Sequence, residues 1–203
     1  SGLHALAALR LGAGRLLAVD IDPNCVATAR GVLQGGAPGA AWEARQRSVL
    51  EMTPDADGRF DIVYSWGVLH HTGAMDRAIR CAAALVAPGG MLAFALYRRT
   101  ALDRLWIAEK RWYARAGKRG QRAARAAYRG LYRLGLLARG RSLAATEAAY
   151  RSRRGMSLTH DIHDWLGGYP YEAILAPEVD RLMTGLGFAA ERVFARGRGL
   201  GRA

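Results

Sequence analysis

Short apolar runs alternate with stretches of helical spacing over the first half of the chain. Apolar runs with the length of buried strands occur at 15–20, 42–47, 60–65 and 90–97. Stretches whose apolar residues recur three and four positions apart lie at 3–11, 23–34 and 74–86. This alternation of helices and apolar strands predicts an α/β fold with a parallel sheet and helices on both of its faces.

The pattern changes after residue 97. Apolar and aromatic residues between 100 and 150 recur at helical spacing and arginines fill the other positions, so this part predicts amphipathic helices. The stretch 154–172 is rich in His, Asp, Trp, Gly and Tyr, and it predicts a shaped loop. Beyond it, residues 178–187 predict a helix and residues 190–195 a last strand.

The net charge of the 203 residues is +13, and it lies in one segment. Residues 98–154 hold seventeen basic and three acidic side chains, a net charge of +14. Aromatic residues among these arginines suit peripheral contact with an anionic membrane. No RNA-binding signature or zinc finger accompanies them, which argues against a specific nucleic-acid partner. No apolar run is long enough to span a bilayer and no signal-peptide pattern is present, so we expect a soluble, cytoplasmic protein.

Three blocks in the first half carry a family signal. Residues 16–23 form an apolar strand that ends in carboxylates, and residues 60–71 form a strand, a small-residue turn and a histidine pair. An Ala-Pro-Gly-Gly sequence at 87–90 precedes another apolar run. In this order and spacing, the blocks resemble the class I S-adenosylmethionine-dependent methyltransferases over residues 1–97. The resemblance implies a Rossmann-like sheet, methyl transfer and S-adenosylmethionine as the cofactor.

In that family, a strand and a glycine-rich loop precede the helix that begins here at residue 3. Ser1-Gly2 resembles the end of that loop, so the resemblance implies a fold that lacks its first strand and carries a helical insertion. It also divides the chain into three parts. These are a partial cofactor-binding core at 1–97, an Arg-rich helical insertion with a substrate loop at 98–172, and the C-terminal helix and strand of the core at 173–203.

Asp20 is the first candidate for the cofactor site. A carboxylate at the end of a parallel strand can accept hydrogen bonds from both ribose hydroxyls of a nucleoside. A helix cap or a turn is the alternative, although Asp22 fits that role better. With the resemblance, Ile21 would cover one face of the adenine, and Gly2 would belong to the loop that holds the cofactor.

Ser48, Val49 and Trp66 complete the cofactor candidates. The family often has an acidic residue facing the adenine amino group where Ser48 and Val49 stand, so main-chain groups would serve here instead. A plain strand end is the alternative at this place. Trp66 follows the strand at 60–65, at the edge where open α/β sheets bind ligands, so its backbone carbonyl could hold the methionine ammonium group. A core tryptophan is the alternative.

The adjacent histidines His70 and His71 point about 100° apart if they lie on a helix. They cannot easily bind one metal ion together, so one is expected to face a pocket and the other to pack or to cap a helix. We name His70 as the pocket candidate.

The run from His160 to Glu172 holds the remaining candidates. Histidines three positions apart suit a metal ion, but the pattern His-Asp-x-x-Asp-Trp-Leu-Gly-Gly-Tyr-Pro-Tyr-Glu resembles a subgroup of bacterial methyltransferases described as ubiquinone-biosynthesis-like. A substrate pocket, a metal site and a structural corner all remain open as interpretations. We expect a pocket without a metal ion, formed by His160, Tyr169 and Tyr171.

The function expected is methyl transfer from S-adenosylmethionine to a small-molecule acceptor, at oxygen or carbon. Such a site mainly aligns the acceptor and excludes water, and a general base assists where the acceptor is a hydroxyl. The alternative is a vestigial methyltransferase portion whose basic amphipathic helices bind an anionic membrane or nucleic acid.

Overall fold

The computed structural model describes residues 2–154 and 157–194 of the chain. The chain divides into two compact units. The first, called the sheet unit below, holds the residues up to 65 together with residues 76–94. The second, called the helical unit, holds residues 66–75 and the chain from residue 95 onward.

The sheet unit contains the predicted alternation of strands and helices. The strands are β1 (Leu16–Asp20), β2 (Trp42–Gln46), β3 (Phe60–Trp66) and β4 (Val86–Ala95). The helices and 3-10 turns beside them are α1 (Leu3–Arg10), α2 (Pro23–Gly36), η1 (Val49–Glu51), α3 (Pro54–Asp57) and α4 (Met75–Ala84). Each element expected before residue 97 is present within four residues of its expected ends, which confirms the α/β fold class.

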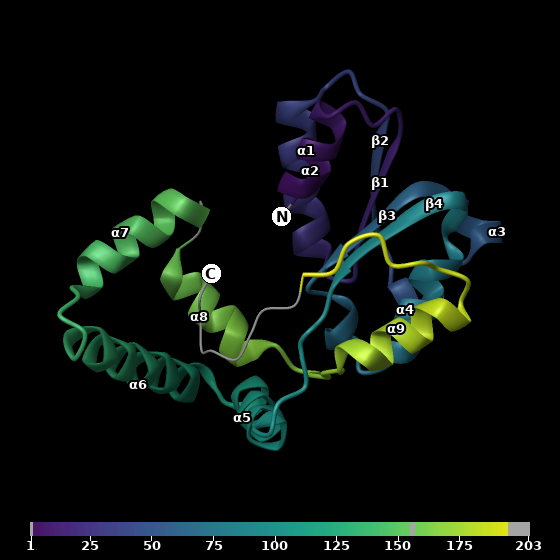
Figure 1. The fold of residues 1–203 in the computed structure, drawn as a ribbon. Helices are drawn as coiled ribbons and strands as arrows, with labels where there is room; N and C mark the ends of the chain where they lie inside the picture. Colours follow the sequence, from purple (N-terminus) through teal and green to yellow (C-terminus); the bar gives the residue numbers. More distant parts are fainter. Residues whose placement is uncertain (1, 155–156, 195–203) are drawn as a thin grey trace. The chain divides into compact units, whose positions relative to one another are not determined.

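Helix α2 shows how the local sequence sets one of these elements. The Asp22 carboxylate accepts a hydrogen bond from the Asn24 N–H at 2.8 Å, and Pro23 fills the first helical position, where a backbone N–H has no partner in the helix. Further along the helix, the apolar side chains of Val26 and Leu33 are buried. α1 and α2 lie side by side next to β1 and β2 (Figure 1).

The strands form two separate pairs. β1 and β2 are parallel, from Leu16 opposite Trp42 to Asp20 opposite Gln46. β3 pairs with β4, and the hydrogen bonds at the two ends of this pair advance in the same direction along both strands, so it is parallel too. Among the described residues no strand joins the two pairs. The edge of β3 away from β4 therefore has no strand partner among the described residues, and Ile62 on this strand is 65% exposed.

The helical unit follows the predicted amphipathic pattern. Its elements are η2 (Leu69–His71), α5 (Asp103–Arg115), α6 (Lys118–Leu137), α7 (Leu143–Arg154), α8 (Leu158–Gly167) and α9 (Ala176–Gly185). Helix α8 packs against α5, α6 and α7, and α9 groups with this unit. None of the helices described is long and apolar enough to cross a membrane.

Two predictions for the second half of the chain are wrong. Residues 158–167 of the expected loop form α8, because Leu158 and Ile162 lie one helical turn apart and both are buried. The strand expected at 190–195 is absent from the described residues 190–194. A strand needs a neighbour to complete its backbone hydrogen bonds, and no described segment pairs with these residues. Residue 195 itself lies outside the described residues.

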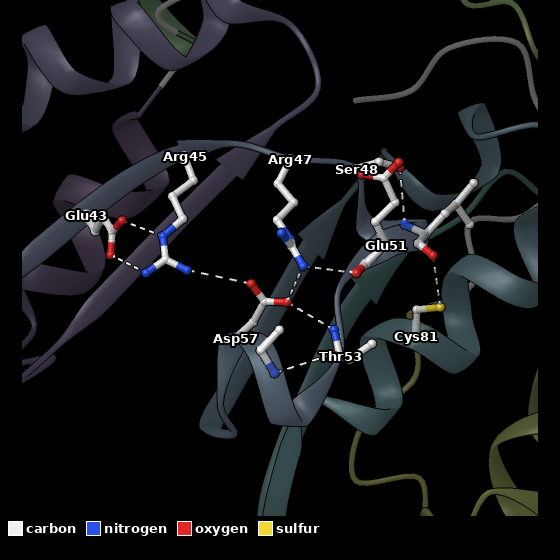
Figure 2. A network of polar contacts seen from close by, with 10 residues as sticks. Glu43, Arg45, Arg47, Ser48, Glu51, Thr53, Asp57 and Cys81 are labelled. Carbon is white, nitrogen blue, oxygen red and sulfur yellow. Dashed lines mark hydrogen bonds and ion pairs between the residues drawn. The ribbon is translucent and has the colours of Figure 1, made fainter.

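A buried carboxylate ties the end of β2 to the turn that follows it. The Asp57 side chain is 1% exposed and lies 3.3 Å from Arg47 Nη2 and 3.6 Å from Arg45 Nη1. Its Oδ2 also accepts a hydrogen bond from the Thr53 N–H at 3.0 Å. Figure 2 shows the carboxylate between the two guanidinium groups. A charge this deeply buried is tolerated only when it is paired and hydrogen-bonded, so the network holds α3 against the end of β2.

We expect Asp57→Asn to lower the free energy of unfolding by about 1–3 kcal/mol, because two arginines lose the carboxylate that they share. Urea unfolding followed by circular dichroism measures this change. The control is Asp55→Asn, at an exposed position of the same short helix, which should change stability by less than about 0.5 kcal/mol. Equal stabilities of the two variants would show that Asp57 does not hold this turn.

Candidate functional site

The carboxyl end of β1 presents Asp20. This residue is half-buried, and its Oδ1 accepts a hydrogen bond from the Asp22 N–H at 3.0 Å. Within the described part of the chain, no hydrogen bond engages Oδ2. The carboxylate is thus oriented by its own backbone and keeps one oxygen that can accept from hydroxyl groups. The helix-cap role belongs to Asp22.

The other cofactor candidates of the sheet unit lie at the same end of β1 and β2. Because the two strands are in register, Asp20 ends beside the turn that holds Ser48 and Val49. The Ser48 hydroxyl accepts a hydrogen bond from the Leu50 N–H at 3.2 Å and so caps η1. Ile21 is 70% exposed. A side chain that covers a ligand must be accessible before the ligand binds, so this exposure fits the expected role.

Two glycines set the backbone next to the remaining candidates. Gly2 has φ 77°, and a Cβ atom there would lie 2.8 Å from Ala29 Cα, so only glycine lets α1 begin against α2. Gly67 has φ 74° and donates its N–H to the Ala95 carbonyl at 3.2 Å, which turns the chain directly after Trp66. Trp66 is 59% exposed, which excludes a core tryptophan.

A short extended segment, residues 170–174, runs between two loops of the helical unit. On one side, the Pro170 carbonyl oxygen lies 2.7 Å from Nδ1 of His71. On the other side, Ile174 pairs with residues 97–99 through two backbone hydrogen bonds of 3.0 Å each. The segment therefore joins η2 to the chain that follows β4.

The histidine pair at η2 has two different environments. A carbonyl oxygen can only accept, so His71 donates its Nδ1–H to Pro170, and Nε2 of the neutral ring carries the lone pair. The His70 ring is 1% exposed and packs against the Tyr97 ring, tilted by 46° and with 4.1 Å between ring centroids. Burial, with a smaller contribution from the neighbouring His71, lowers the pKa of His70 to about 3, so His70 is neutral at pH 7.

The helical unit contains a cavity of about 660 Å³, a size typical of pockets for small ligands. Aromatic and imidazole rings form much of its wall, and two carboxylates and the amide of Gln121 add polar groups. These side chains are His71, Tyr97, Tyr113, His163 and Trp165, with Asp161 and Asp164. Flat rings and a few polar groups suit the binding and orientation of a small polar molecule.

The described lining of this cavity does not include the four pocket candidates His70, His160, Tyr169 and Tyr171. His71 lines it in place of His70. The side chain of His160 lies outside the described part of the structure, and Tyr169 is 42% exposed. No group of three or more His, Cys, Asp and Glu side chains among the described residues is arranged to hold a metal ion.

Tyr171 lies beside the cavity wall and supports it. Its ring packs against the Tyr97 ring at a tilt of 34°, with 5.4 Å between centroids, and Lys110 Nζ lies 5.4 Å from the centroid of the Tyr171 ring. Burial, with smaller contributions from Asp103 and Tyr97, raises the pKa of Tyr171 to about 12. The hydroxyl therefore stays protonated at neutral pH and cannot act as a general base.

One contact in the cavity wall escaped the sequence analysis. The Tyr113 hydroxyl on α5 lies 2.6 Å from Nδ1 of His163 on α8. Fifty positions separate them, and no local spacing links the two. Tyr113 has the helical spacing of its apolar neighbours, and the pattern therefore indicates only that it belongs to an amphipathic helix.

A family model of the methyltransferase domain matches residues 1–94. This stretch contains the strands of the sheet unit and the edge that carries Asp20. This match agrees with the resemblance of residues 1–97 to the class I S-adenosylmethionine-dependent methyltransferases. S-adenosylmethionine is accordingly the cofactor that this methyltransferase domain implies.

The methyltransferase domain also has curated relatives. The ribosomal protein L11 methyltransferase of Pelotomaculum thermopropionicum is 37% identical over 92 residues, 45% of this chain and 28% of that protein. The ubiquinone biosynthesis O-methyltransferases of Xanthomonas euvesicatoria and Xanthomonas axonopodis are each 33% identical over 99 residues, 49% of this chain and 40% of theirs. The aligned part thus spans less than half the length of these relatives. No solved structure gives a significant match.

The lowered pKa of His70 predicts a pH dependence of stability. Between pH 6.5 and about 3 the unfolded chain binds a proton at His70 that the folded chain does not, so stability falls as the pH falls through this window. One such proton contributes a slope of up to about 1.4 kcal/mol per pH unit. We expect His70→Phe, which keeps an aromatic ring, to reduce the slope of the free energy of unfolding against pH. Urea unfolding at several values between about pH 4.5 and 7 measures this slope.

The control is His4→Gln, at an exposed histidine of α1, which should leave the slope close to that of the unmodified protein. If His70→Phe has an unchanged slope, His70 is not the group that becomes protonated on acid unfolding.

Proposed function

We propose that this protein is an S-adenosylmethionine-dependent methyltransferase that acts on a small-molecule acceptor. The observation that carries the proposal is the Asp20 carboxylate, which Asp22 orients and whose Oδ2 remains for the ribose hydroxyls of the cofactor. Ile21 is exposed beside it and suits one face of the adenine. The backbone of Ser48 and Val49 supplies polar groups at the same strand ends. These residues fit the cofactor.

The cavity of the helical unit suits the acceptor. Bound S-adenosylmethionine supplies a methyl group on a positively charged sulfur, which keeps the electron pair of the broken C–S bond when the acceptor forms its new bond. His71 accepts the proton that an acceptor hydroxyl loses, because its Nδ1–H is held by Pro170 and Nε2 is free of a proton. Tyr97 and Trp165 align the acceptor and exclude water. A base at this place favours methylation at oxygen.

Helix α6 supports a second role, peripheral contact with an anionic membrane. Leu131, Leu134 and Leu137 recur every three residues and are 71%, 63% and 55% exposed. The exposed Arg122 and Arg133 lie on the same helix. Exposed leucines with arginines nearby are the combination that inserts into the interface of an anionic bilayer, and nothing in it favours the bases of a nucleic acid.

The cofactor part of the proposal is tested by calorimetric titration with S-adenosylhomocysteine. We expect Asp20→Ala to weaken binding by about 1.5–3 kcal/mol, roughly 10- to 100-fold, because the ribose hydroxyls lose a charged acceptor. The control is Asp55→Ala, which removes an exposed carboxylate from the same unit and should leave the affinity unchanged. Equal affinities of Asp20→Ala and the unmodified protein would remove Asp20 from the cofactor site.

The membrane contact is tested by co-sedimentation with vesicles. We expect binding to phosphatidylglycerol vesicles but little to phosphatidylcholine vesicles, and Leu134→Asp should reduce it because the charge cannot enter the interface. The control is Leu11→Asp, at a leucine that is 89% exposed in the sheet unit. Equal losses in both variants, or binding of RNA in preference to anionic vesicles, would contradict this role.

A further inference from the structure

Three helices of the helical unit bring a tyrosine, an arginine and a histidine into contact. Tyr113 of α5 is a buried residue, 1% exposed, and its hydroxyl oxygen lies 2.6 Å from Nδ1 of His163 on α8. Arg125 Nη1 of α6 lies 2.8 Å from the Tyr113 oxygen and 3.1 Å from the same Nδ1. The contacts thus converge on one nitrogen of the His163 ring.

The hydrogen bonds fix where the proton of the His163 ring lies. A guanidinium group can only donate, so both the Tyr113 oxygen and His163 Nδ1 accept from Arg125. The hydroxyl hydrogen of Tyr113 is then donated to Nδ1. Because Nδ1 receives donors, the proton of the neutral imidazole lies on Nε2. His163 lines the cavity, and within the described residues no hydrogen bond engages its Nε2, so Nε2–H remains for a ligand.

We propose that His163 is the hydrogen-bond donor that binds an oxygen atom of the acceptor molecule, held in its Nε2–H form by Tyr113 and Arg125. This inference rests on the proposed function, since it concerns the cavity assigned to the acceptor. His163 binds and orients the acceptor but takes no proton from it, because Nε2 already carries one.

The two histidines of the cavity therefore offer opposite hydrogen-bonding roles at Nε2. His71 presents a lone pair at Nε2, since its Nδ1–H is donated to Pro170, whereas His163 presents an Nε2–H. A ligand that satisfies both carries one group with a proton to donate and a separate oxygen with a lone pair to accept. The acceptor class is a small molecule with a hydroxyl group and a second oxygen, such as a carbonyl, an ether or another hydroxyl.

The position of the His163 ring proton is tested by long-range ¹H–¹⁵N NMR spectra of the histidine rings. The spectra are recorded at a pH above the ordinary pKa of histidine, where the rings are neutral. We expect His163 to show the Nε2–H form alone, and the double variant Tyr113→Phe, Arg125→Leu to show a mixture of both forms. An Nδ1–H form in the unmodified protein would overturn the proposal.

Ligand binding is tested with phenol, and with toluene as a probe of similar shape that lacks the oxygen. Phenol should shift the Nε2 signal of His163, and toluene should not. His163→Leu should raise the dissociation constant for phenol about 2- to 10-fold, whereas His163→Gln, which keeps an N–H donor, should stay closer to the unmodified protein. Absence of the shift, or equal affinity in His163→Leu, would overturn the proposal.

Titration with S-adenosylhomocysteine separates this inference from the proposed function. The histidine variants should bind it as the unmodified protein does, because Asp20, Ile21, Ser48 and Val49 belong to the sheet unit and His163 to the helical unit. Unchanged binding would also show that the variants fold. If phenol binds as expected but S-adenosylhomocysteine does not bind at all, the donor assignment stands and the methyltransferase proposal fails.

Discussion

The hydrogen bonding of residues 170–174 is the constraint on which the helical unit depends. This segment connects parts of the chain that are about a hundred residues apart: Glu172 N–H donates to the His70 carbonyl at 3.0 Å, and Glu172 Oε2 accepts from the Met75 N–H at 2.9 Å. Ile174 makes the matching pair of bonds to residues 97–99. With the turn at Gly67, these bonds fix η2 on both sides, so the backbone that carries the histidine pair has little freedom to move.

The same constraint gives the two adjacent histidines different hydrogen-bonding states. The Pro170 carbonyl takes the Nδ1 proton of His71 and leaves Nε2 able to accept another. His70, one position earlier, is pressed into the interior beside Tyr97, where burial keeps it neutral. Gly168 allows this arrangement, because a Cβ there would lie 2.8 Å from Cε1 of His71. The first and last parts of the helical unit thus fix the orientation of the His71 ring together.

Sequence patterns predicted the parts that depend on local rules. Strands and helices before residue 97 follow from apolar spacing, and the start of α2 follows from Asp22 and Pro23. The pattern did not separate His70 from His71, because the choice depends on a carbonyl 99 positions away from the ring that it holds. The contact of Tyr113 with His163 depends on how three helices pack, which no spacing in one segment encodes. α8 was missed because its many polar residues hide the buried Leu158 and Ile162.

The acceptor class is the central claim, because the cofactor follows from the family whereas the cavity alone points to a small molecule. The most direct measurement is transfer of tritium from methyl-labelled S-adenosylmethionine to a cell extract, separated by size into small molecules and macromolecules. A cavity of about 660 Å³ walled by rings predicts label in the small-molecule fraction. Label confined to the protein fraction would contradict a small-molecule acceptor.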